Sequence, residues 1–272
     1  DSLDAINPKH QADPTQEKNM YHVRQFLANN ALVASGMGLD GDSDRIAVMT
    51  KTGRLLSGDV MTAVFVKNIH KKRSLLHVVM DIKSSQMIVD SLRSTGVKVF
   101  LSPSGHPLIR EAMSMCNATI GGEMSGHFFL QDRYFGYDDG IYALVRLMEI
   151  MFMTKTYTIE PFIQDFPLTV DLGEVQLSCS GHIQDAIIAH VYSSFHKVQD
   201  VHLMTIDGVR IHVPYGWALV RKSNTQPVLT VRCEATTKND FIFLSKLLIE
   251  AMCVMVDTTI LEQRVADVLG RL

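Results

Sequence analysis

The pattern of apolar and polar residues changes once along the chain, near residue 166. Before that point, short apolar runs typical of strands alternate with stretches whose apolar residues recur every three or four positions, as in amphipathic helices. We expect strands at residues 32–39, 46–50, 75–83 and 97–103, strand and loop at 119–131, and helices at 20–28, 59–68, 84–96, 105–118 and 138–154. Strands that alternate with helices predict βαβ units and a mostly parallel sheet, which is an α/β fold.

After residue 166 the pattern is different, and apolar and polar residues alternate over longer stretches. Residues 168–179, 201–223 and 227–237 have the period-two pattern of antiparallel strands, whereas 182–195 and 241–256 have helical patterns. Antiparallel strands combined with separate helices predict an α+β domain at the end of the chain.

Size and composition suit a protein with a substantial core. The chain has 272 residues, of which 46% are hydrophobic, and this is enough for two or three domains. Its 26 basic and 29 acidic residues give a net charge of −3, which argues against a general nucleic-acid partner.

Cysteine usage and hydropathy favour a cytoplasmic location without a membrane partner. The four cysteines are far apart and are expected to be free thiols: Cys116, Cys179, Cys233 and Cys253. The most apolar run, residues 241–256, is too short to span a bilayer, and no signal peptide is visible. The chain begins at Asp1 within a predicted loop, which favours a piece of a longer protein.

The stretch GLDGDSDRIAVM places three carboxylates on alternate residues directly before an apolar strand, at Asp40, Asp42 and Asp44. Carboxylates this close repel one another, and a hard cation such as Mg²⁺ accepts such oxygens readily. An EF-hand is excluded, because its sixth and twelfth loop positions would be Arg45 and Lys51. The spacing therefore favours a metal site over a solvated turn.

A phosphatase with an aspartyl nucleophile is the alternative interpretation of the same loop. Asp40 or Asp42 would be the nucleophile, since two aspartates separated by one residue after a strand suit that class as well. Lys83 and the pair Asp138 and Asp139 would complete such a site.

Two glycine-containing segments carry further candidate chemistry. In GGEMSGHF, the side chains of Glu123 and Ser125 can receive vicinal sugar hydroxyls, with His127 beside them, while the glycines allow close approach of a ligand. In SPSGHPLIRE, His106 lies at the start of a predicted helix, where the helix dipole attracts anions.

A donor-rich loop separates two predicted strands of the last domain. In VRKSNTQPV, a guanidinium and several short donors offer a phosphate cradle, at Arg221, Ser223, Asn224 and Thr225. An ordinary polar hairpin is the alternative for this segment taken alone.

Taken together, these motifs resemble one family, the α-D-phosphohexomutases, and within it the bacterial phosphomannomutase/phosphoglucomutase branch. DGDSDR is similar to the metal loop of that family, GEMSGH to its sugar-binding segment and RKSNT to its phosphate-binding loop. The motifs occur in the expected order and cover nearly the whole chain.

The resemblance implies three domains of a four-domain fold. Residues 1–54 would be the latter part of domain 2, residues 55–166 domain 3, and residues 167–272 the α+β domain 4. Mixed sheets are expected in the phosphohexomutase-type α/β domains 2 and 3. The first domain, with the serine that carries the catalytic phosphate, has no counterpart in these residues and is expected in a missing N-terminal part of the same protein.

The resemblance also implies roles for the candidate residues. The metal ligands for Mg²⁺ would be Asp40, Asp42 and Asp44, and the active-site residues Arg45, Lys83, His106 and His127. The sugar contacts would be Glu123 and Ser125, and the phosphate anchor Arg221, Ser223, Asn224 and Thr225. The histidine segment departs from the family pattern, with proline at Pro103 in place of a lysine and Ser104 in place of a threonine.

The implied activity is interconversion of hexose 1-phosphate and 6-phosphate, with mannose, glucose or both as the sugar. A phosphoserine would give its phosphoryl group to the substrate, and a hexose 1,6-bisphosphate would be the intermediate and activator. His106 or His127 would act as acid or base. A phosphosugar-binding fragment without catalysis shares every motif and remains the alternative, because the serine is absent from this chain.

Overall fold

The computed structural model describes residues 12–70, 76–223 and 226–272, and the chain forms two compact units. Unit 1 comprises Asp1–Ser84 and Ile88–Phe166, and unit 2 comprises Ser85–Met87 and Pro167–Leu272. Among the described residues, no helix combines the length and the apolarity that a membrane span requires.

The central element of unit 1 is a four-stranded sheet in the order β5-β4-β6-β7. Its strands are β4 (His77–Asp81), β5 (Lys98–Ser102), β6 (Ile120–Gly122) and β7 (Phe128–Leu130). β4 pairs in parallel with β5 and with β6, whereas β7 pairs antiparallel with β6. The expected mostly parallel sheet is therefore confirmed, with one antiparallel strand at its edge.

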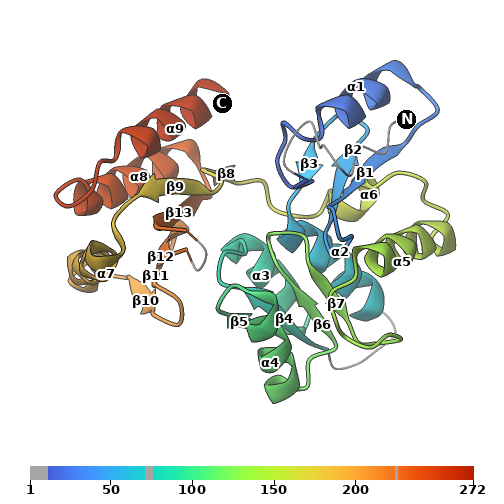
Figure 1. Cartoon of the computed structure of the whole chain (residues 1–272), viewed down its shortest axis with the longest axis horizontal. Helices are drawn as coiled ribbons and strands as arrows, with labels where there is room; N and C mark the ends of the chain where they lie inside the picture. The colour runs from blue at the N-terminus through green and yellow to red at the C-terminus, as the bar shows by residue number, and fades with distance from the viewer. Residues whose placement is uncertain (1–11, 71–75, 224–225) are drawn as a thin grey trace. The chain divides into compact units, whose positions relative to one another are not determined.

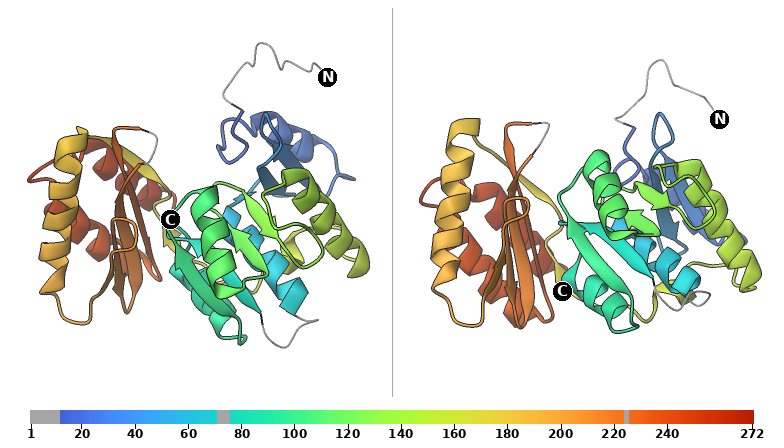
Figure 2. Two further views of the ribbon diagram at one scale, coloured as in Figure 1. Left: turned by 60° about the horizontal axis from the view of Figure 1, so that its bottom comes forward. Right: turned by 90° about the horizontal axis from the view of Figure 1, so that it is seen from below.

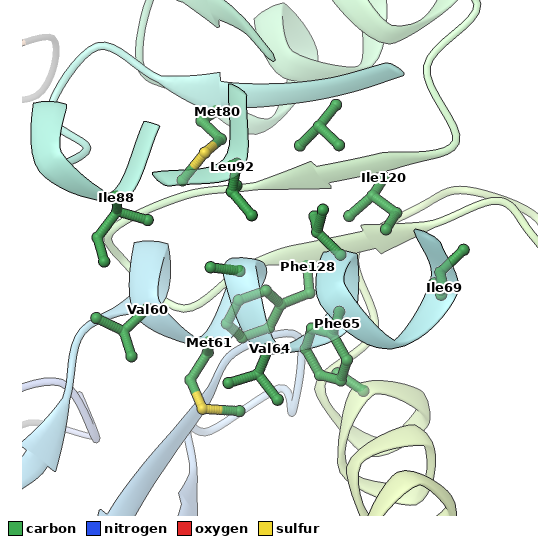
Figure 3. Close-up of a cluster of buried hydrophobic side chains, with 14 of the residues drawn as sticks. Val60, Met61, Val64, Phe65, Ile69, Met80, Ile88, Leu92, Ile120 and Phe128 are labelled. Carbon is green, nitrogen blue, oxygen red and sulfur yellow. The ribbon is translucent and has the colours of Figure 1, made fainter. Parts of the chain in front are cut away.

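Helices cover both faces of this sheet (Figure 1). α2 (Gly58–His70) and α3 (Gln86–Arg93) pack on the face to which Val78 and Met80 point. Figure 3 shows side chains of α2, among them Val60, Val64, Phe65 and Ile69, in one buried cluster with Met80 and Ile120 of the sheet. α4 (His106–Cys116) packs on the opposite face, where Val79 and Phe129 meet Ile109 and Met113. Because successive strand residues point to opposite faces, one short apolar strand supplies both cores.

A smaller antiparallel sheet, β1-β2-β3, completes unit 1. It is formed by β1 (Ser35–Leu39), β2 (Ile46–Thr50) and β3 (Leu55–Leu56). α1 (Tyr21–Asn29) covers it through a small apolar cluster that includes Leu27 and Met49. On β2, Ile46 and Val48 join the main core instead.

Two helices follow β7. These are α5 (Gly140–Met153) and the short α6 (Glu160–Ile163). The helix expected at residues 138–154 is confirmed. Three residues of its apolar stripe are nevertheless more than half exposed, namely Ile141, Val145 and Met148. The buried face of α5 carries Ala143, Arg146, Leu147 and Ile150 instead.

Unit 2 contains an antiparallel sheet in the order β10-β11-β12-β13-β8, with β9 also paired to β13. Its strands are β8 (Val170–Asp171), β9 (Val175–Ser178), β10 (His202–Met204), β11 (Val209–Val213), β12 (Gly216–Lys222) and β13 (Val228–Ala235). Its helices are α7 (Gly181–His196), α8 (Lys238–Met252) and α9 (Thr259–Gly270), and α7 and α8 lie side by side against the sheet (Figure 2). The expected α+β architecture is confirmed, and α9 is an additional helix that the sequence pattern did not indicate.

The strands of unit 2 present alternate residues to two different environments. Val220 and Val231, for example, belong to the apolar core beneath the helices. On the other side of the sheet, the guanidinium of Arg210 lies 3.7 Å from the centre of the Trp217 ring. The indole N–H of Trp217 donates to Glu234 at 2.5 Å, so this buried carboxylate has a fixed partner.

Candidate functional site

The three alternating carboxylates occupy the acidic loop, residues 40–45, which joins β1 to β2. Leu39 pairs with Ile46, so the loop leaves and re-enters the sheet at neighbouring positions. Asp40, Asp42 and Asp44 each place one carboxylate oxygen within 4.8 Å of the others. The structure thus brings the predicted metal ligands together.

Asp40 is held by the arginine of its own loop. The backbone N–H of Arg45 donates to Asp40 Oδ1 at 3.1 Å, and its Nε donates to Oδ2 at 2.6 Å. Burial disfavours the charged form of Asp40, but these hydrogen bonds and the positive charge of Arg45 outweigh burial and lower the pKa of the carboxyl. Asp40 is therefore kept ionised and oriented.

One carboxylate oxygen of Asp44 lacks a hydrogen bond among the described residues. This atom, Oδ1, is buried. Burial, together with the charges of the two neighbouring carboxylates, raises the pKa of the Asp44 carboxyl even though His127 opposes it. Oδ1 is 3.9 Å from Arg45 Nε, too far for a hydrogen bond, and lies beside two other carboxylates. It fits a hard cation such as Mg²⁺, whose preferred donors are carboxylate oxygens.

The glycine loop, residues 122–127, joins β6 to β7 and is bonded to the acidic loop's end. Gly126 has a φ of 89°, which suits glycine, and its carbonyl accepts the N–H of Ile46 at 3.0 Å. Arg45 and His127 also form an isolated antiparallel bridge. Two motifs that are far apart along the chain are thus fixed to each other by backbone contacts.

Within the glycine loop, His127 is surrounded by oxygen acceptors. Its Nδ1 lies 2.9 Å from Ser125 Oγ and 3.3 Å from Glu123 Oε2, while its Nε2 lies 3.4 Å from Asp44 Oδ2. Burial alone would lower the pKa of His127, but the hydrogen bond and charge of Glu123, followed by the other nearby carboxylates, raise it. The histidine is therefore biased toward the protonated form.

Glu123 links the glycine loop to the predicted histidine segment. Its Oε1 accepts the backbone N–H of Gly105 at 2.7 Å, immediately before α4 begins at His106. Burial would raise the pKa of Glu123, but its hydrogen bonds to His127 and Gly105, with the charge of Lys83, lower it overall. This contact was not foreseen from the sequence, which assigned Glu123 to sugar hydroxyls.

His106 lies at the start of α4, as predicted, and belongs to the same group of side chains. Its ring centroid is 6.2 Å from that of His127, and its Nδ1 is 3.9 Å from Asp138 Oδ2. Lys83 follows β4 in a turn and is close enough for its charge to favour the ionised forms of Asp81 and Glu123. Unit 1 therefore gathers the predicted residues from the acidic loop, the glycine loop, the start of α4 and the turn after β4.

The start of α5 contributes residues for which the sequence gave only a weak signal. Asp139 caps the helix by accepting the N–H of Tyr142 at 2.7 Å, and Gly140 N–H donates to the carbonyl of Ser43 at 2.9 Å. Asp138, which the sequence offered only within the phosphatase alternative, places an oxygen beside Asp44 and His127. Two successive aspartates before a helix were the available signal for this element.

Asp81, at the end of β4, is a second residue that sequence reasoning missed. It is fully buried and accepts hydrogen bonds from Ser84 Oγ at 2.9 Å and Ser104 Oγ at 3.3 Å. Burial raises its pKa to about 6, against the favourable charge of Lys83. Asp81 thus connects the turn that contains Lys83 to the segment that precedes His106 through hydrogen bonds.

The donor-rich loop belongs to unit 2, between β12 and β13. Arg221 Nε donates to Asp207 Oδ2 at 2.8 Å, and its buried Nη2 has no hydrogen-bond partner among the described residues. The backbone N–H of Ser223 donates to the carbonyl of Val228 at 3.0 Å. A fixed guanidinium with an unused buried donor fits an anion. Asn224 and Thr225 lie outside the described residues.

Family models match both units of the chain. Residues 57–167 match the model described as phosphoglucomutase/phosphomannomutase, alpha/beta/alpha domain III. Residues 184–241 match the C-terminal domain of phosphoglucomutase/phosphomannomutase.

Individual relatives agree with these matches. The chain is 33% identical over 239 residues to a phosphomannomutase/phosphoglucomutase of Pseudomonas aeruginosa, covering 88% of this chain and 51% of that protein. It is 31% identical over 237 residues to a phosphoglucomutase of Neisseria meningitidis, covering 87% of this chain and 51% of that protein. The chain therefore spans about half the length of the curated relatives it matches.

A solved structure shows the same arrangement of elements. The crystal structure of a phosphoglucomutase/phosphomannomutase family protein from Burkholderia thailandensis has a TM-score of 0.82 and 28% sequence identity, and the match covers 92% of this chain and 53% of that one. The motifs, their order and these matches agree, and the chain belongs to the phosphoglucomutase/phosphomannomutase family of phosphohexomutases.

Proposed function

We propose that this chain supplies the metal-, sugar- and phosphate-binding residues of a phosphohexomutase that interconverts hexose 1-phosphate and hexose 6-phosphate. The observation that carries the proposal is the joining of the acidic loop to the glycine loop. Oδ2 of Asp44 and Nε2 of His127 are 3.4 Å apart, and backbone hydrogen bonding fixes the two loops together. A phosphoryl group and a sugar can thus be bound by adjacent loops of one unit.

The acidic loop fits Mg²⁺ as its cofactor. Asp40, Asp42 and Asp44 would hold the ion, which when bound offsets negative charge on a transferring phosphoryl group. Arg45 orients the carboxylate of Asp40 by donating a hydrogen bond to its Oδ2. Because Arg45 is bonded to Asp40, Oδ1 of Asp44 and the exposed carboxylate of Asp42 remain available to bind the ion.

The glycine loop would bind the hexose. Glu123 and Ser125 offer acceptors for sugar hydroxyls, and His127, with its raised pKa, can hold a proton at Nε2 or Nδ1 near a reacting oxygen. Lys83 places a positive charge beside the same group of residues. His106 is the second candidate for proton transfer, 6.2 Å from His127 between ring centroids.

The remaining parts of the reaction are assigned by family resemblance. Arg221 and Ser223 would anchor the non-reacting phosphate, which is supported by the buried Nη2 of Arg221, a donor without a hydrogen-bond partner among the residues that the structure describes. The phosphoserine would lie in a segment of the protein outside these 272 residues, since no serine of the chain lies in the corresponding motif. A hexose 1,6-bisphosphate would be the intermediate, and mannose and glucose are both candidate sugars.

The test is calorimetric titration of the purified chain, in Mg²⁺, with glucose 1-phosphate, mannose 1-phosphate and inorganic phosphate. The substitution Glu123→Gln should weaken hexose-phosphate binding about tenfold, because it removes a charged acceptor while an amide oxygen still accepts from Gly105. Binding of inorganic phosphate should be unchanged. The matched control is Glu111→Gln at an exposed position of α4.

The chain by itself should bind hexose phosphates without interconverting them in a coupled assay, because a missing covalent nucleophile removes several powers of ten in rate. Equal affinity of the wild type for glucose 1-phosphate and for inorganic phosphate would contradict the proposal. An equal loss for both ligands in Glu123→Gln would show that the loop has collapsed and that Glu123 does not contact the sugar.

A further inference from the structure

Asp44 belongs to two different groups of candidate metal ligands. One is the set of three acidic-loop carboxylates, and the other consists of Asp44, His127 and Asp138, whose ligand atoms also lie within 4.8 Å of one another. The second group draws on three separate elements: the acidic loop, the glycine loop and the residue pair before α5. Its donor set includes an imidazole, which the first group lacks.

One distance within the second group matches tetrahedral coordination. Two ligands bound at about 2.0–2.1 Å with a tetrahedral angle are about 3.3 Å apart, which is the geometry that Zn²⁺ prefers with histidine and aspartate. The separation of His127 Nε2 from Asp44 Oδ2 is 3.4 Å. Asp138, which is partly buried like His127, supplies the third donor atom, a carboxylate oxygen.

The orientation of His127 is also that of a metal-binding histidine. Ligating histidines usually donate their other ring N–H to a carboxylate, which fixes the ring and the tautomer. Here Nδ1 lies 3.3 Å from Glu123 Oε2, and Glu123 is in turn fixed by the N–H of Gly105. With Nδ1 bonded to Glu123 and Ser125, Nε2 is the nitrogen that faces Asp44, and it would bind an ion once it has lost its own proton.

The geometry points to a second cation site, formed by Asp44, His127 and Asp138, that takes a borderline-soft divalent ion such as Zn²⁺ or Co²⁺ rather than Mg²⁺. Imidazole and carboxylate donors suit Zn²⁺ and Co²⁺, whereas Mg²⁺ prefers oxygen donors alone. The two sites share Asp44, whose Oδ1 lies in the acidic-loop group and whose Oδ2 faces His127, so binding of an ion at one site affects the other. Zn²⁺ bound there would occupy Nε2 of His127 and one oxygen of Asp44.

The experiment titrates the purified chain with Co²⁺, followed by its visible d–d absorption, and then with Zn²⁺ in competition. Intense absorption bands indicate tetrahedral Co²⁺ bound by nitrogen and oxygen donors. The substitutions His127→Gln and Asp138→Asn should each weaken Zn²⁺ binding by more than about tenfold and remove the intense bands. The control His182→Gln, at an exposed histidine of α7, should change neither.

A second comparison separates the two sites. Asp42→Asn should weaken Mg²⁺ binding and leave Zn²⁺ binding unchanged, whereas Asp138→Asn should do the reverse. Zn²⁺ binding that falls with Asp42→Asn as much as with Asp138→Asn would overturn the inference, since the ion would then lie among the acidic-loop carboxylates. Zn²⁺ binding unaffected by His127→Gln would overturn it as well.

These measurements use metal ions alone and need no sugar phosphate. If hexose phosphates fail to bind, the proposed function fails while the metal results still decide the second site. If His127→Gln lowers the chain's urea midpoint by no more than the control does, a loss of Zn²⁺ affinity is attributable to the missing ligand and not to unfolding.

Discussion

Substituting Asp81 by asparagine should stabilise unit 1 at neutral pH, although it removes a buried charged group that bridges two segments of the site. The carboxyl of Asp81 is fully buried, and burial is the main cause that raises its pKa to about 6 from 3.8. The hydroxyls of Ser84 and Ser104 donate hydrogen bonds to it and can reorient to suit an amide. Asparagine therefore retains the shape and the hydrogen bonds without the cost of a buried negative charge.

The magnitude follows from the difference in pKa between the folded and unfolded chain. The folded state binds the Asp81 proton more tightly, so its contribution to stability is fully present below pH 3.8 and is lost as the pH rises through about 6. A change of this size corresponds to about 3 kcal/mol. We expect Asp81→Asn to be more stable than the wild type by about 2–3 kcal/mol at pH 7.5, because asparagine avoids the cost of the buried charge. At pH 4 the two proteins should be equally stable.

The assay is urea unfolding at intervals between pH 4 and pH 8, followed by far-UV circular dichroism. Trp217, the one tryptophan of the chain, lies in unit 2, so its fluorescence reports whether that unit is altered. The matched control is Asp165→Asn, at an exposed position of unit 1. The difference between the free energies of unfolding of variant and wild type isolates the Asp81 contribution at each pH.

A constant difference across the pH range would refute this reasoning, because it would mean that Asp81 does not change its protonation between the two states in that window. A lower stability of Asp81→Asn at pH 7.5 would refute it in another way. The ion pairing of Asp81 with Lys83 would then outweigh burial, and the carboxylate would be a favourable part of the folded structure.

Two further predictions concern packing around the site and within unit 2. Gly140→Ala should destabilise the chain by about 1–3 kcal/mol and weaken Mg²⁺ binding, because a Cβ atom would lie 2.8 Å from the carbonyl oxygen of Arg45; unchanged calorimetric affinity for Mg²⁺ would contradict this. Trp217→Phe should cost about 1.5–3 kcal/mol in urea unfolding at pH 7 by leaving Glu234 without its indole donor, and part of that loss should be recovered in Trp217→Phe combined with Glu234→Gln.

Hydrophobic patterning was sufficient to predict most elements of both units. The strand–helix alternation before residue 166 and the period-two stretches after it depend on the repeat of the backbone itself, which is 3.6 residues per turn in a helix and two in a strand. The same patterning did not predict which side of α5 would be buried. Ile141, Val145 and Met148 form an apolar stripe at helical spacing, yet they are exposed, whereas Arg146 is buried against Asp132. Periodicity predicts a helix, but the neighbouring elements select the face that packs.

The motifs, likewise, identified candidate ligands without showing how they meet. The spacing of Asp40, Asp42 and Asp44 indicated a cation, because three carboxylates in five residues repel one another wherever they lie. The raised pKa of Asp81, the anchoring of Gly105 by Glu123 and the position of Asp138 beside His127 have no local signature. Each arises from residues far apart in the sequence that the sheet and its loops bring within a few ångströms. The sequence by itself therefore determined which chemical groups the site contains, and only the tertiary structure decided their neighbours, because burial, charge interactions and coordination depend on distances between elements and not on positions along the chain.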